Sequence, residues 1–272
     1  MKLRGALVAA LVVVIGAVVL WRRSSADLEW SPIAASPAVG PSCPDRSETP
    51  RRVDRELRFI TWRGRGVTEV QVRDQLERAS AVYARHGVRL LTPPEPRALD
   101  AEALLEGSRE VLEEGLRAAG IDPRQRVAGA NRERSRQVIC AIALGPLRRW
   151  LAEEASRDHV NVVILTRIAE PQAAIAALLP DLRGLTLHPP TTGATLTRCL
   201  GDDDVPSAVL IGLDGIAARR PETVDVTLAH ELGHVLGLSH PAGVTPAPDL
   251  MATDPPACVP LLTNAQLDQL AM

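Results

Sequence analysis

The chain has 272 residues, of which 46% are hydrophobic and 24% charged, and this balance suffices for a domain with one buried core. The formal net charge of −2 argues against a general nucleic-acid-binding protein, which needs a basic surface. Only 2% of the residues are aromatic, so aliphatic side chains must fill most of the core.

The first element is an uninterrupted apolar run, residues 6–21, which basic residues flank on both sides. Its length lies between that of a signal-peptide core and that of a membrane-spanning helix. Residues 24–26 would suit a cleavage site, but Arg22 and Arg23 precede them and disfavour processing. We therefore expect residues 1–23 to be an uncleaved single-pass membrane anchor, with the signal peptide of a secreted protein as the alternative. Either signal places the rest of the chain outside the cytoplasm.

Residues 24–54 are expected to form a proline-rich linker. Five prolines lie between residues 24 and 50, and proline both removes a backbone donor and restricts the chain. Such a stretch is typical of a stalk rather than of a core element. We expect the folded domain to span residues 55–272.

The folded domain is expected to open with a strand, a helix and a second strand. Residues 57–62 predict the first strand. Thr68 and Gln71 predict a capping box, and apolar residues then recur at helical spacing until Gly87 ends the helix. Residues 88–91 predict the second strand.

A helical insertion, residues 92–137, is expected to follow. It holds an amphipathic helix over residues 100–119 and then five arginines between residues 124 and 136. Such a basic loop is more often a solvated surface than a site for an anionic partner. The elements expected next are strands at residues 137–144, 160–166 and 207–213 and a helix at residues 147–156.

The strongest functional signal lies in residues 230–240, which fill every specified position of the pattern H-E-x-x-H-x-x-G-x-x-H. Residues four apart lie on one face of a helix, so His230 and His234 present two imidazoles in the same direction. Glycine adopts positive φ without steric cost, so Gly237 permits the turn that returns His240 to the other two.

These residue types suit a catalytic zinc ion. Zinc binds imidazole nitrogen at roughly 2.0–2.1 Å, and catalytic sites use three protein ligands and keep one position open. Glu231 can approach a water at that position as a general base without occupying the metal. We expect Thr223 or Asp225 to cap the helix of the motif, and Thr263 with Gln266 to cap the last helix of the domain.

Together with Met251, the motif resembles the signature of the metzincin zinc peptidases, which place a Met-turn behind the metal. Met251 is the only methionine between the two terminal ones. The flanking residues of His240 and the short spacing to Met251 are most similar to matrixin-like bacterial members. The alternative for Met251 is a flexible side chain that fills the core.

The resemblance implies an α/β (α+β) fold of the zincin type, with a mixed twisted sheet, an active-site helix, a Met-turn and a C-terminal helix. It implies that His230, His234 and His240 bind one zinc ion and that Glu231 is the catalytic base. It also implies that Met251 packs below the metal.

Two departures limit what the resemblance implies. The astacin-like branch has a tyrosine after the Met-turn methionine, whereas the only tyrosine here is Tyr83. Matrixins usually follow that methionine with Tyr-Pro, whereas residues 252–255 read Ala-Thr-Asp-Pro. Substrate preference is therefore not carried over.

Four cysteines, Cys43, Cys140, Cys199 and Cys258, suit an oxidising compartment and allow three disulfide pairings. The resemblance to the reprolysin branch implies a Cys199–Cys258 bridge, with Cys43–Cys140 as the second bridge. An alternative is that Cys43 ligates zinc in a latent form, as in the cysteine switch of matrixins, although the full motif of that switch is absent.

The resemblance carries two weaker expectations. Metzincins often hold Ca²⁺ in the region of Asp202, Asp203 and Asp204, although a charged exposed turn is the favoured reading of these residues. Family members also pair an extended substrate with an edge strand, for which residues 192–196 are the candidate.

The function expected from these features is that of a monomeric zinc endopeptidase acting on protein or peptide substrates. One alternative is a catalytically silent zinc-bearing domain that binds peptides in the cell envelope. A second is a zinc amidase acting on a non-protein amide, which would use the same residues.

Overall fold

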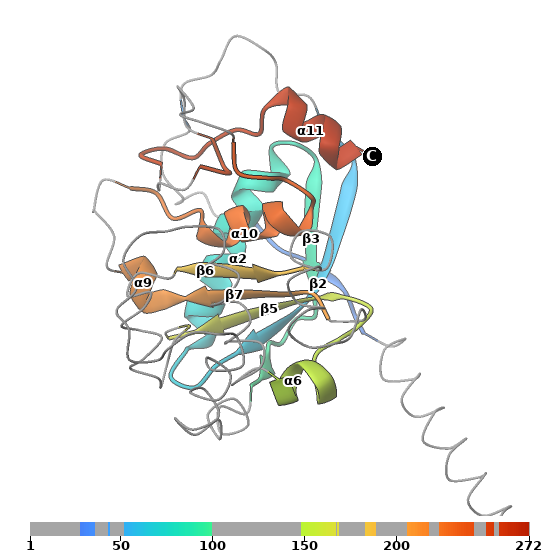
Figure 1. The fold of residues 1–272 in the computed structure, drawn as a ribbon, viewed down its shortest axis with the longest axis vertical. Helices are drawn as coiled ribbons and strands as arrows, with labels where there is room; N and C mark the ends of the chain where they lie inside the picture. Colours follow the sequence, from blue (N-terminus) through green and yellow to red (C-terminus); the bar gives the residue numbers. More distant parts are fainter. Residues whose placement is uncertain are drawn as a thin grey trace, which may run out of the picture.

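The structure is a computed structural model, and it forms a mixed α/β fold around one sheet (Figure 1). It describes residues 28–35, 43, 52–99, 148–166, 168, 183–188, 206–217, 223–241, 249–252 and 256–271.

The sheet of the described residues has seven strands. They are β1 (Ser31–Pro32), β2 (Arg55–Arg63), β3 (Val88–Thr92), β4 (Arg97–Ala98), β5 (Val160–Leu165), β6 (Gly184–Leu187) and β7 (Ala208–Gly212). The strand order is β1-β3-β2-β5-β7-β6, and β4 pairs with β2 outside this path. The inner strands β3, β2, β5 and β7 run parallel, whereas β1 and β6 run antiparallel at the two edges.

Five helices are described: α2 (Glu69–Ala84), α6 (Arg148–Glu153), α9 (Leu213–Ala217), α10 (Thr227–Val235) and α11 (Asn264–Ala271). Helix α10 packs against α2 and also against β6 and β7. It therefore lies beside β6, one of the two antiparallel edge strands of the sheet (Figure 1).

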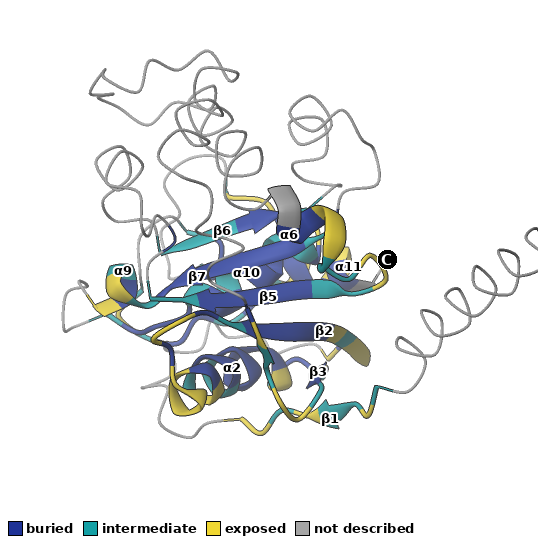
Figure 2. Cartoon of the chain, turned by 90° about the horizontal axis from the view of Figure 1, so that it is seen from below, coloured by how far each residue is buried: buried dark blue, intermediate teal, exposed yellow. Residues whose placement is uncertain are grey.

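The inner strands are mostly buried (Figure 2): β7 is buried along its whole length, whereas β2 is exposed at its start and buried from Phe59 to Trp62. One face of the sheet packs with α2 and α10 in a common core. Its residues in that core include Phe59, Val162, Ile164, Val209 and Ile211. On β2 the buried Trp62 meets Trp150 of α6 edge to face, with ring centroids 5.5 Å apart. Its indole N–H donates to the Asn161 side-chain oxygen at 3.0 Å.

Helix α2 holds α10 in place through two buried hydrogen bonds. The Tyr83 hydroxyl donates to the Ala229 carbonyl at 2.7 Å, and Gln75 Nε2 donates to Asp225 Oδ2 at 2.7 Å. The other oxygen of Asp225 accepts from the Thr227 N–H at 3.1 Å. The N-cap position itself is Val226, which makes no side-chain cap hydrogen bond, so the prediction that Thr223 or Asp225 occupies the cap is wrong. Burial raises the pKa of Tyr83, so the hydroxyl remains a donor.

The elements expected on both sides of the site are confirmed where the structure describes them. Thr68 and Gln71 form the predicted capping box of α2, and Gly87 follows the helix with φ +78°. Thr263 and Gln266 form the second box: the Thr263 N–H donates to Gln266 Oε1 at 2.9 Å, and the Gln266 N–H donates to Thr263 Oγ1 at 3.2 Å.

Part of the expected linker, residues 24–54, pairs with the sheet. Ser31–Pro32 pairs with β3, and the Ile33 N–H donates to the Leu90 carbonyl at 3.0 Å. The Ser80 hydroxyl donates to the Ile33 carbonyl at 2.8 Å. Pro32 lies on an edge strand, where its missing donor costs no ladder hydrogen bond.

The disulfide prediction is wrong for Cys258, because this residue is bonded to Cys43 and not to Cys199. The Cys43 N–H also donates to the Val259 carbonyl at 3.0 Å, so the two segments lie together along the backbone. Cys43 is therefore neither bonded to Cys140 nor available as a zinc ligand in this state. Cys140 and Cys199 lie outside the described residues.

The prediction of a membrane-spanning helix is also corrected. Within the part of the chain that the structure describes, no helix is long and apolar enough to cross a membrane. The apolar run at residues 6–21, on which that prediction was based, lies outside the described residues.

Other expectations also fall on residues that the structure does not describe. They concern the helix at residues 100–119, the basic loop at 124–136, the strand at 137–144, the edge candidate at 192–196 and the aspartates Asp202, Asp203 and Asp204.

The Cys43–Cys258 bridge closes a loop with a sequence separation of 215 residues. Because a bridge of this kind restricts the unfolded chain, the Cys43→Ser/Cys258→Ser variant is expected to lose about 2–5 kcal/mol of unfolding free energy. Denaturant unfolding measures this loss. Peptide mapping under non-reducing conditions identifies the bonded cysteines. A linked peptide pair that contains Cys199 and Cys258 would contradict the Cys43–Cys258 bridge.

Candidate metal centre

The three histidines of the motif are brought together by the turn that ends α10. The Gly237 N–H donates to the His234 carbonyl at 3.1 Å, and the Leu238 N–H donates to the Gly233 carbonyl at 2.9 Å. With Gly237 at φ +90°, this is the Schellman arrangement of a helix end. The chain leaves the helix at this turn, and His240 follows three residues after Gly237.

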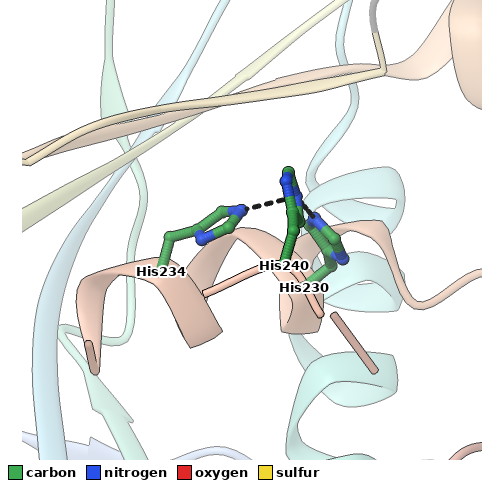
Figure 3. Close-up of side chains that lie close together, drawn as sticks. All are labelled: His230, His234 and His240. Atoms are coloured by element: carbon green, nitrogen blue, oxygen red, sulfur yellow. Dashed lines mark hydrogen bonds between the residues drawn. The ribbon is translucent and has the colours of Figure 1, made fainter. Parts of the chain in front are cut away.

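The ring nitrogens of the three histidines converge on one point (Figure 3). His240 Nε2 lies 3.1 Å from His230 Nε2 and 3.1 Å from His234 Nε2. Three nitrogens bound tetrahedrally to zinc at the usual bond length would lie roughly 3.3 Å apart. His230 and His234 are half-buried, whereas His240 is exposed, so the cluster is open to solvent on one side.

The opposite ring nitrogens of His230 and His234 face backbone carbonyls. His230 Nδ1 lies 2.7 Å from the Leu250 oxygen, and His234 Nδ1 lies 2.9 Å from the Leu238 oxygen. Since a carbonyl only accepts, both Nδ1 atoms carry the proton. In the neutral rings Nε2 then has no proton and offers a lone pair. This is the tautomer that binds a metal through Nε2.

This tautomer assignment favours a cation between the rings. Two lone pairs, on His230 and His234, both point at His240 Nε2, and that atom can donate at most one proton. In neutral rings, at least one of the two 3.1 Å contacts would therefore have no proton between its two nitrogens. A single metal ion would satisfy all three nitrogens together, so the donor set fits zinc.

The surroundings also favour the neutral rings. Burial lowers the pKa of each of the three histidines, and it lowers that of His234 to about 4. Mutual repulsion between the rings adds to the effect at His230 and His234. The rings are therefore neutral near pH 7, each with one nitrogen free of a proton, as metal ligands must be.

Met251 lies in a turn directly below α10. The Ala252 N–H donates to the Asp249 carbonyl at 3.1 Å, and the Met251 N–H donates to Asp249 Oδ1 at 2.7 Å. Met251 is fully buried, and a Cβ added to Gly233 would lie 2.6 Å from its sulfur. The same turn presents the Leu250 carbonyl to His230, so it both supports the helix and orients a ring.

Glu231 points away from solvent, toward the edge strand β6. Its Oε2 accepts a hydrogen bond from the Thr186 hydroxyl at 2.6 Å. Burial raises the pKa of this carboxyl group to about 7, and the Thr186 hydrogen bond partly opposes the rise. A pKa near neutrality suits a group that takes and returns a proton.

Every predicted residue of the centre lies within this small region, but two contributors from β6 were not predicted. Thr186 and Gly184 contact Glu231, whereas the expected edge strand was at residues 192–196. The only sequence signal for β6 is one short stretch, residues 184–187, which alternates small or polar residues with leucine. Four residues of this kind predict a strand only weakly.

Comparisons with known proteins identify no family for this chain. No protein-family model matches it, and no match was found among curated proteins. What the chain does must therefore be inferred from the site itself.

The cluster is expected to bind one zinc ion with an affinity that falls in acid. Protons compete for the Nε2 lone pairs only as the pH falls through the lowered histidine pKa values, about 4 for His234. The dissociation constant should change little between about pH 7.5 and pH 6.5, and should rise on the order of 100-fold by about pH 4. Calorimetric titration with zinc measures it, and His240→Ala is the control that removes one ligand. Undiminished binding at the acid end would contradict the assignment.

The contact between α10 and the turn below it is tested by Gly233→Ala. The added Cβ would lie 2.6 Å from the Met251 sulfur, so the variant is expected to lose about 1–3 kcal/mol of unfolding free energy and to bind zinc more weakly. Shortening the neighbour in Gly233→Ala/Met251→Ala should make the combined loss smaller than the sum of the two single losses. Additive losses, measured by denaturant unfolding, would show that the two side chains do not meet.

Proposed function

We propose that the protein is a zinc-dependent endopeptidase with a metzincin-like active site. The observation that carries this proposal is a buried carboxylate, Glu231, placed one residue from a cluster of three converging histidines that is open to solvent. The mixed sheet, the helix α10, the turn at Met251 and the C-terminal α11 agree with the element order of that fold.

The chain's own residues have distinct parts in the proposed reaction. When bound, zinc supplies Lewis-acid polarisation of the attacking water and of the scissile carbonyl. His230, His234 and His240 would hold the ion. Glu231 takes the proton of the attacking water and passes it to the departing amine nitrogen. The carbonyls of Leu238 and Leu250 hold two of the rings in the ligating tautomer.

An extended peptide substrate has a place beside this cluster. Strand β6 pairs with β7 on one side only, and no other strand of the described residues covers its outer edge. It also packs against α10. We therefore assign the substrate edge to β6 in place of residues 192–196, because backbone groups on a free edge can pair with an extended chain.

A catalytically silent zinc domain explains less of the site. A structural zinc ion usually has four protein ligands, whereas the group found among the described residues has three. Such a site also has no use for a buried carboxylate beside the ligands. A zinc amidase acting on a non-protein amide needs the same residues and remains the second candidate.

The setting that we propose for this activity is an oxidising compartment outside the cytoplasm. The bridge between Cys43 and Cys258 supports this setting, since disulfides persist where thiols are not kept reduced. We also propose that the protein is a monomer.

Glu231→Gln is expected to retain zinc binding and to lose peptide hydrolysis by about 100- to 10,000-fold, because the proton acceptor is removed while the ligands stay. A peptide library with mass-spectrometric readout measures turnover, and calorimetry measures zinc.

Two controls make this test specific. His234→Ala should lose both zinc and activity, and a chelator should abolish the activity of the unmodified protein, with recovery on adding zinc. A Glu231→Gln variant that turns over as fast as the unmodified protein would refute the proposed base. A library of peptides left uncut, with a non-protein amide cleaved, would favour the amidase.

A further inference from the structure

We propose that Thr186 is a positioning residue for Glu231, and that Gly184 provides the space in which the carboxylate sits. This inference rests on the proposed function, because it assigns Glu231 the part of proton carrier. It concerns two residues of β6 that the sequence pattern does not single out.

The contact between β6 and Glu231 has two parts. Thr186 Oγ1 lies 2.6 Å from Glu231 Oε2, and both residues are buried. Gly184 lies two residues earlier on the strand, hence on the same face. A Cβ added there would lie 2.6 Å from Cγ and 2.8 Å from Cδ of Glu231, and closer still to Oε1. Only glycine therefore leaves room for the carboxylate in this position.

The Thr186 hydroxyl faces two acceptors with one proton. Besides Oε2 at 2.6 Å, the backbone carbonyl of Glu231 lies 3.0 Å from Oγ1. When Glu231 is ionised, the hydroxyl donates to Oε2. When Glu231 carries a proton on Oε1, Oε2 still accepts from the same hydroxyl. Neither state leaves the buried Thr186 hydroxyl without an acceptor.

A contact that persists in both states matches what the proposed reaction asks of Glu231. The carboxylate accepts one proton from the attacking water and later releases that proton to the amine, so it passes through both states in every turnover. A hydroxyl holds the carboxyl group in place in both states, so the group need not be repositioned between the two transfers.

A purely structural part for Thr186 predicts a different result. In that case loss of the hydroxyl would weaken the fold and leave the turnover of the folded protein unchanged. The buried pair Thr61 and Thr92, with Oγ1 atoms 2.9 Å apart on β2 and β3, provides a matched control. Thr61→Val removes a buried hydroxyl of the same kind that makes no contact with Glu231.

The experiment compares the unmodified protein with Thr186→Val, Thr186→Ser and Thr61→Val, each loaded with zinc. Thr186→Val is expected to lower kcat about 10- to 100-fold, the scale of a misplaced catalytic group, with KM changed less than about threefold. Thr186→Ser, which keeps the hydroxyl, is expected to recover most of kcat. Thr61→Val is expected to keep kcat. The zinc dissociation constant should stay within about threefold in all three variants, because neither threonine touches a histidine ligand.

Other outcomes overturn the proposal. It fails if Thr186→Val keeps its kcat, if Thr186→Ser is as slow as Thr186→Val, or if zinc binding falls in parallel with kcat. Should Thr186→Val not fold, Gly184→Ala takes its place. That variant keeps the hydroxyl but fills the space of the carboxylate, so it must lower kcat while retaining zinc.

A second readout separates this inference from the proposed function. In the zinc-free protein, Thr186→Val and Glu231→Gln are combined in a double-mutant cycle of unfolding equilibria. We expect the two changes to be non-additive by about tenfold in the unfolding constant, because their side chains share a buried hydrogen bond. Additive changes overturn the pairing whatever the activity. An unmodified protein that binds zinc but cuts no peptide refutes the peptidase proposal, and the cycle still tests the contact.

Discussion

Three imidazole nitrogens lie close enough together to share one cation. In neutral rings at most one of the two 3.1 Å contacts at His240 can carry a proton, whereas a cation between the rings would satisfy all three nitrogens. The surrounding structure enforces this arrangement. The turn at Gly237 returns the chain to α10, while the carbonyls of Leu238 and Leu250 fix the orientation of two rings.

Three elements support helix α10, which carries two of the three histidines. Helix α2 holds α10 through Tyr83 and Gln75, and the turn at Met251 supports it from below. Strand β6 contacts the same helix at Glu231. Because a metal site tolerates displacements of only a fraction of an ångström, such support is what a preorganised centre requires.

Much of this centre could be predicted from sequence because its constraints are local. The spacing of His230 and His234 follows from the helical repeat, and Gly237 follows from the φ of the turn. The capping boxes are likewise local and are confirmed. Contacts between distant segments could not be predicted in this way: the pairing of Thr186 with Glu231 and the pairing of β1 with β3 depend on how the sheet assembles. The disulfide partner of Cys258 depended on that same packing, so resemblance to a family was a poor guide to it.

The bridge from Cys43 to Cys258 makes the backbone between them a closed ring. Cutting a ring once yields no separate pieces. A single nick anywhere between these residues, including one made by another copy of the protein, therefore leaves both fragments attached. The nicked molecule would migrate near full length on a denaturing gel and separate into two bands only after a thiol is added.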